Sequence, residues 1–145
     1  MAEQTTSSIV IDASPAQVMD VIADFPAYPA WAQGMQQVDV VEEGAGGRAA
    51  KVHFELEATP IKDSYTLQYE WDGDRAVRWH LVEGKMLKDL KGAYELAPAG
   101  GGTEVTYRLT VEVAIPMIGL LRRKAEKVII DTALKGLKKR VESLG

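Results

Sequence analysis

The sequence contains no cysteine and only two histidines, His53 and His80. Without thiols the chain forms no disulfide and has no cysteine nucleophile. The two histidines lack partners at metal-ligand spacing, and both fall on strand positions that we expect to face outward. No G-x-S-x-G motif is present, and the glycines at 44–47 and 100–102 belong to expected hairpins rather than to a helix start. We therefore expect no metal, no cofactor, no nucleophilic triad and no phosphate-binding loop.

Long apolar runs are also missing, since no stretch approaches the roughly 18 residues that a membrane-spanning helix needs. Residues 1–8 are polar and include Glu3, which is unlike a signal peptide. The 145 residues are 46% hydrophobic and 26% charged, which is typical of one globular domain with a proper core. These features predict a single cytoplasmic domain over residues 1–145.

The net charge of −4 is unevenly distributed along the chain. Residues 117–145 hold eight Lys or Arg and three acidic residues, whereas the remainder holds nine basic and eighteen acidic residues. The acidic remainder would repel phosphate, so nucleic acid is not an expected partner. The basic segment fits transient contact with a membrane surface, but a solvated helix face is the favoured interpretation. We expect a monomer or a weak dimer.

A long amphipathic helix is predicted over residues 117–144. Pro116 precedes it, and proline is well tolerated in a first helical turn. Gly136 lies within it, which predicts either close approach by another element or empty space beside the helix. Apolar and small residues recur at helical spacing; they are Leu121, Ala125, Val128, Ile129, Thr132, Ala133, Gly136, Leu137, Val141 and Leu144, with Ile130 and Leu134 widening the stripe.

The N-terminal region predicts a short strand followed by a helix. Residues 7–11 are β-rich, and Ser14 then caps a helix in which Pro15 takes the first position and Gln17 completes a capping box. This helix should end near Asp24. Residues 25–34 should form a turn or a second short helix, with the aromatic side chains pointing inward.

From residue 36 onward the apolar period changes to two, which predicts six strands joined by hairpins. Together with the first strand and the long helix, they define an α+β protein in which a seven-stranded antiparallel sheet curves around the C-terminal helix. One helix is too narrow to fill so wide a sheet, and the shape therefore predicts an internal pocket. Its expected aromatic lining comprises Phe54, Tyr65, Tyr69, Trp79, Tyr94 and Tyr107.

Two charged residues, Asp63 and Lys88, fall in phase with the inward-facing apolar residues. A lone buried charge is costly, so they could pair across the pocket or face a polar ligand group, and one could serve as a general acid or base. The favoured alternative is that a bulge or the rim of the sheet exposes them. Tyr65 is a third catalytic candidate, although such tyrosines are more often core residues. Further expected ligand contacts are Met86, Lys88, Met117, Leu121 and Val128.

Five short segments form a recognisable pattern: residues 11–18 (IDASPAQV), 21–24 (VIAD), 28–31 (YPAW), 91–96 (KGAYEL) and 102–107 (GTEVTY). This pattern resembles the SRPBCC superfamily, which includes START-like lipid-transfer domains and polyketide cyclase/dehydrase-like proteins. The similarity covers about residues 7–144. It implies a helix-grip fold around a hydrophobic cavity, whose entrance would lie among residues 59–61, 83–85 and 115–119.

The resemblance implies a protein that binds a hydrophobic or amphipathic small molecule of lipid, quinone or polyketide type, as a carrier or sensor. A polyketide cyclase or dehydratase that uses the same cavity is the alternative, with Asp63, Lys88 or a tyrosine for proton transfer. A third alternative is a protein-interaction module that uses the basic helix. The sequence favours a binding protein over an enzyme, because the motifs are those of a scaffold.

Overall fold

The computed structural model describes residues 4–32, 34–58, 61–113 and 119–144. Seven strands, three α-helices and two short 3₁₀ turns follow one another along the chain. They are β1 (Thr5–Ile11), α1 (Pro15–Ala23), η1 (Phe25–Ala27), α2 (Tyr28–Trp31), β2 (Met35–Glu43), η2 (Ala45–Gly47), β3 (Ala49–Ala58), β4 (Ile61–Asp72), β5 (Ala76–Gly84), β6 (Leu87–Ala99), β7 (Gly102–Val113) and α3 (Gly119–Leu144).

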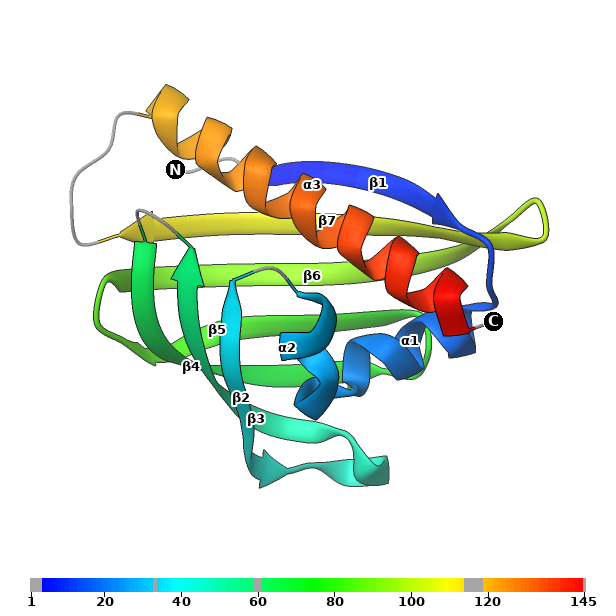
Figure 1. Cartoon of the computed structure of the whole chain (residues 1–145), viewed down its shortest axis with the longest axis horizontal. Helices are drawn as coiled ribbons and strands as arrows, with labels where there is room; N and C mark the ends of the chain where they lie inside the picture. The colour runs from blue at the N-terminus through cyan, green and yellow to red at the C-terminus, as the bar shows by residue number, and fades with distance from the viewer. Residues whose placement is uncertain (1–3, 33, 59–60, 114–118, 145) are drawn as a thin grey trace.

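The strands form one antiparallel sheet in the order β1-β7-β6-β5-β4-β3-β2. Consecutive hairpins build β2 to β7, and β1 then pairs with β7 at the far edge. The sheet curves, α3 lies along β1 and β7, and α1 and α2 link the two edges on the same side as α3 (Figure 1). This confirms the expected helix-grip architecture.

The capping box of α1 is confirmed. The Ser14 hydroxyl oxygen accepts a hydrogen bond from the Gln17 N–H at 3.2 Å, and the Gln17 side-chain oxygen accepts one from the Ser14 N–H at 2.9 Å. The helix ends before Asp24, as expected. The next residues form η1 and α2, and Phe25 is fully buried beneath them. This segment therefore covers one end of the concave face with an aromatic ring.

The buried stripe of α3 differs from the expected one. Val128 is 60% exposed, and Ile129, Thr132 and Leu144 are also exposed, so their placement in the stripe was wrong. The helix lies lengthwise along two strands and buries only a narrow row of side chains. That row consists of Glu126, Ile130, Leu134, Leu137 and Val141.

Of the two expectations for Gly136, the structure agrees with a neighbouring element rather than with empty space. A Cβ atom at this position would lie 3.4 Å from the carbonyl oxygen of Trp31, at the end of α2. The expected contacts at Pro116, Met117 and the side chain of Leu121 lie outside the described part of the structure. Among the described residues, no helix is long and apolar enough to cross a membrane.

Candidate functional site

Aromatic side chains cover the concave face of the sheet. Strand register pairs them across neighbouring strands, because residues opposite each other in an antiparallel pair point to the same face. The pairs are Phe54–Tyr65, Tyr69–Trp79 and Tyr94–Tyr107, with ring centroids 5.3, 5.7 and 4.7 Å apart. All six side chains are buried. The structure thus brings together every aromatic residue that the sequence predicted on this face.

The aromatic pairs join into one layer. The ring centroid of Trp79 lies 5.2 Å from that of Tyr94 and 5.6 Å from that of Tyr107. Phe25 of η1 packs on Tyr69 at 4.9 Å and so connects the layer to the helical segment above it. Contacts of this kind add about 0.5–1.5 kcal/mol per pair beyond the area buried.

The tyrosine hydroxyls of this layer differ in their partners. The Tyr28 hydroxyl donates a hydrogen bond to the carbonyl oxygen of Ile22. The hydroxyls of four other tyrosines form no hydrogen bond with any described residue, although their side chains are buried. The four are Tyr65, Tyr69, Tyr94 and Tyr107.

Burial keeps these four phenols protonated. Desolvation raises the pKa of Tyr65, Tyr69, Tyr94 and Tyr107 above the usual value for tyrosine, because the phenolate would lose its hydration. For the first three, the proximity of Tyr107 raises the pKa further. At physiological pH the layer therefore offers neutral hydrogen-bond donors on an apolar surface. It offers no phenolate base.

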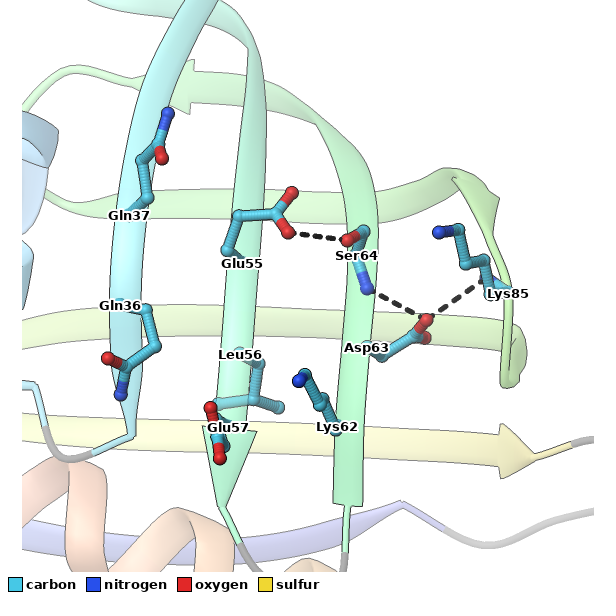
Figure 2. Close-up of a pocket in the computed structure, with 9 residues that line it drawn as sticks. All are labelled: Gln36, Gln37, Glu55, Leu56, Glu57, Lys62, Asp63, Ser64 and Lys85. Atoms are coloured by element: carbon cyan, nitrogen blue, oxygen red, sulfur yellow. Dashed lines mark hydrogen bonds between the residues drawn. The ribbon is translucent and has the colours of Figure 1, made fainter.

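Asp63 lies inward and is only 4% exposed, so the favoured interpretation that a bulge or the rim exposes it was wrong. Its Oδ1 atom accepts hydrogen bonds from the backbone N–H groups of Ser64, Lys85 and Met86 at 2.8, 3.2 and 3.2 Å, and Oδ2 accepts one from Leu87 N–H at 3.1 Å. Figure 2 shows the carboxylate between β4 and the turn that joins β5 to β6. The structure thus ties Asp63 to that turn.

Lys88 is exposed, in agreement with the favoured interpretation that a bulge or the rim of the sheet exposes it, and the alternative that it lies inward was wrong. The register between β6 and β7 shifts between Leu87 and Asp89. Leu87 pairs with Val113 and Asp89 with Glu112, so β6 contains one extra residue at this point, a β-bulge. Leu87 consequently takes the buried position and Lys88 is exposed, while Met86 is half-buried. Within the described residues, no ion pair joins Lys88 to Asp63.

A polar groove of about 540 Å³ lies at the ends of β2, β3 and β4, beside the β5–β6 turn (Figure 2). Glu55 on its wall accepts a hydrogen bond from the Ser64 hydroxyl at 2.6 Å and contacts the ring of His53. The hydrogen bond from Ser64 has the larger effect and the one with His53 the next, and both lower the pKa of the Glu55 carboxyl. Glu57, Lys62 and the other side chains lining the groove include no aromatic ring. The groove is thus unlike an apolar ligand site.

The histidines offer no catalytic or metal arrangement in the described part of the chain. His80 is exposed, as expected, and His53 is half-buried and contacts Glu55 and Thr66. No group of three or more His, Cys, Asp or Glu side chains in that part is placed to hold a metal ion.

Glu126 is a charged residue of α3 that is almost fully buried, with 1% of its surface exposed. Its Oε1 atom accepts a hydrogen bond from the Thr5 hydroxyl at 2.6 Å, and Oε2 accepts one from Val111 N–H at 2.7 Å. From the sequence alone, Glu126 is only one of the acids of a basic helix, and this role was not predicted. Its spacing of four residues before Ile130 was the available signal, because it places both side chains on one helix face.

Gly92 makes room for the indole of Trp79 in the aromatic layer. A Cβ atom at Gly92 would lie 2.4–2.5 Å from three atoms of that ring. We expect Gly92→Ala to lower the free energy of unfolding by about 1–3 kcal/mol, because overpacking forces the ring to move. Urea unfolding monitored by tryptophan fluorescence measures this change.

Gly136→Ala is the control, since its new methyl makes only ordinary contacts. Alanine also improves helix propensity over glycine by about 1 kcal/mol. An equal loss of stability in both variants would contradict the prediction.

The fold and its aromatic concave face define a START-like, helix-grip protein. The sequence profile of the family "Polyketide cyclase / dehydrase and lipid transport" matches residues 2–142. The chain therefore belongs to this family, whose members bind hydrophobic small molecules or act as aromatase/cyclases.

Solved structures share the fold over nearly their whole length. A START superfamily protein from Mycobacterium smegmatis aligns with a TM-score of 0.91 at 20% identity, covering 98% of this chain and 99% of that one. A protein from Thermus thermophilus aligns at 0.82 and 25% identity, covering 99% of both chains. The aromatase/cyclase Zhui from a Streptomyces species aligns at 0.75 and 14% identity, covering 97% and 93%. No curated protein matches the chain significantly.

Proposed function

We propose that the chain carries a hydrophobic or amphipathic small molecule between the concave face of the sheet and α3. The observation that carries this proposal is a buried aromatic surface on which the hydroxyls of four tyrosines form no hydrogen bond with any described residue. The four are Tyr65, Tyr69, Tyr94 and Tyr107. A ligand of the matching chemistry has an apolar, largely flat body and one or more carbonyl oxygens. Burial of apolar area would supply most of the affinity, at about 25 cal/mol per Å², and the hydroxyls would orient the ligand.

Native mass spectrometry of the purified protein, before and after denaturing extraction, tests for a copurifying ligand. A bound lipid, quinone or polyketide would support the carrier and identify its ligand class. The apo protein is then titrated with menadione, a naphthoquinone with two carbonyl oxygens, while tryptophan quenching is measured. The chain has no cysteine with which the quinone could react. Absence of saturable binding would count against the proposal.

Removing one donor should weaken menadione binding. We expect Tyr94→Phe and Tyr107→Phe each to lower the affinity about two- to tenfold, because one hydrogen bond contributes about 0.5–1.5 kcal/mol. Affinity for 2-methylnaphthalene, which has the same body without carbonyls, should stay unchanged.

Tyr28→Phe is the matched control for these variants. Its hydroxyl already donates to the Ile22 carbonyl, so the substitution should lower stability rather than menadione affinity. If the variants at Tyr94 and Tyr107 bind both probes as the unaltered protein does, the hydroxyls do not contact the carbonyls.

A carrier agrees better with the described residues than a cyclase does. Proton abstraction requires a buried base, but both oxygens of Asp63 accept backbone hydrogen bonds, Lys88 is exposed, and burial raises the pKa of Tyr65. Catalysis by these three residues stays a prediction. Asp63→Asn and Lys88→Met would leave the menadione affinity of a carrier within a few-fold, whereas both would abolish the turnover of a cyclase.

A further inference from the structure

The acidic side chains of α3 are all engaged within the protein. Glu126 is buried and binds Thr5 and Val111. Asp131 accepts a hydrogen bond from Lys127 at 3.1 Å, and Glu142 accepts one from Lys138 at 2.7 Å. No acid of this helix therefore remains to neutralise its other cations.

Lys127 and Lys138 also hold α3 against the sheet. Lys127 Nζ donates to the Ser7 hydroxyl at 3.1 Å, and Lys138 Nζ donates to the Val10 carbonyl oxygen at 2.8 Å. Lys127 and Lys138 thus differ from the other cations of α3, because they contact β1. Five other cations of this helix form no ion pair with any described residue: Arg123, Lys124, Lys135, Lys139 and Arg140.

Three of these cations share the solvent-facing ridge of α3 with an apolar residue. Lys124, Val128, Lys135 and Lys139 recur at helical spacing on the side opposite the buried row. Val128 is 60% exposed at the middle of this ridge. Figure 1 shows α3 lying across β1 and β7, with no other described element passing over it. We call these four residues the α3 ridge.

The rest of the chain has the opposite charge. Outside residues 117–145, acidic residues outnumber basic ones by eighteen to nine. This separation orients α3 toward an anionic surface, while the rest of the molecule is repelled from it. A flat surface fits this arrangement, because it can contact the helix without approaching the acidic remainder.

We propose that the α3 ridge docks on an anionic lipid surface, with the lysines at the headgroups and Val128 entering the boundary between headgroups and acyl chains. An apolar side chain between lysines is the pattern of a helix that lies in a membrane interface. A nucleic acid would offer phosphates but no apolar layer for Val128. The docking does not depend on the identity of the carried molecule.

Cosedimentation with vesicles tests this proposal. We expect the full chain to pellet with vesicles of equal parts phosphatidylglycerol and phosphatidylcholine, not with phosphatidylcholine alone, and to be released by high salt. Lys135→Gln combined with Lys139→Gln should weaken binding about 25-fold, because each cation near an anionic membrane contributes about fivefold. Val128→Ser should weaken it by a few-fold.

Arg78→Gln combined with Lys91→Gln is the control, since it changes the net charge equally at exposed residues of β5 and β6. It should bind vesicles as the unaltered protein does. Equal losses in both double variants, equal binding to neutral vesicles, or no binding at low salt would each overturn the proposal. So would binding to duplex DNA that is as strong and as dependent on Lys135 and Lys139. Circular dichroism verifies that every variant is folded.

Discussion

Replacing Asp63 with asparagine is expected to lower the free energy of unfolding by about 3 kcal/mol, because hydrogen bonds to a buried carboxylate contribute about 1.5–3 kcal/mol each. All four partners of Asp63 are backbone N–H donors. The amide nitrogen of asparagine is itself a donor, so it would face at least one of them without an acceptor. Urea unfolding at neutral pH gives this difference.

Asp20→Asn is the control for this substitution. The Asp20 side chain is 79% exposed and its contact with Arg48 is a long 3.9 Å ion pair, so the expected change is below about 0.5 kcal/mol. Hydrogen exchange should also rise at the amides of Lys85, Met86 and Leu87 in Asp63→Asn. Unchanged stability and exchange would show that the turn does not need the carboxylate.

Replacing Glu126 with glutamine should lower the free energy of unfolding less than Asp63→Asn does. Glu126→Met is expected to lower the free energy of unfolding by about 3 kcal/mol, since it leaves the buried Val111 N–H and the Thr5 hydroxyl without partners. Glu126→Gln should restore all but about 1 kcal/mol, because its oxygen can accept from Val111 while its nitrogen donates to Thr5. Urea unfolding compares the two variants.

The expected difference in stability between Asp63→Asn and Glu126→Gln follows from the hydrogen-bond partners of the two carboxylates. A hydroxyl can donate or accept, whereas a backbone N–H can only donate. If Glu126→Gln were as unstable as Glu126→Met, the negative charge of Glu126 rather than its hydrogen bonds would hold α3 to β1 and β7. Hydrogen exchange within α3 would locate the loosened segment.

The sequence predicted the parts of the fold that depend on local chemistry. Ser14, Pro15 and Gln17 specify the start of α1 by themselves. Strand alternation placed Phe54, Tyr69 and the other aromatic residues of the concave face correctly, because each side chain there obeys the period of its own strand.

Predictions failed where a non-local contact decides. Alternation along β4 and β6 could not separate Asp63, which is buried, from Lys88, which a bulge exposes, because the shift between Leu87 and Asp89 depends on how β6 pairs with β7. The buried row of α3 depends on the angle at which the helix meets β1 and β7, since its apolar residues surround much of the helix. Glu126 shows the same limit, because Thr5 and Val111 come from distant strands. The proposed ligand chemistry likewise rests on which hydroxyls form no hydrogen bond with a described residue, and strand alternation does not specify this.

The irregular register of β2 bears on the solubility of the protein. This strand lies at an open edge of the sheet, where its unpaired backbone groups could recruit a strand from another molecule. Three register shifts interrupt its pairing with β3, and it carries Asp39, Glu42 and Glu43. Bulges and charges of this kind oppose the flat, uncharged edge that fibril growth requires. At the opposite edge, Lys138 Nζ donates a hydrogen bond to the carbonyl oxygen of Val10 in β1. We therefore expect both edge strands to be poor templates for aggregation.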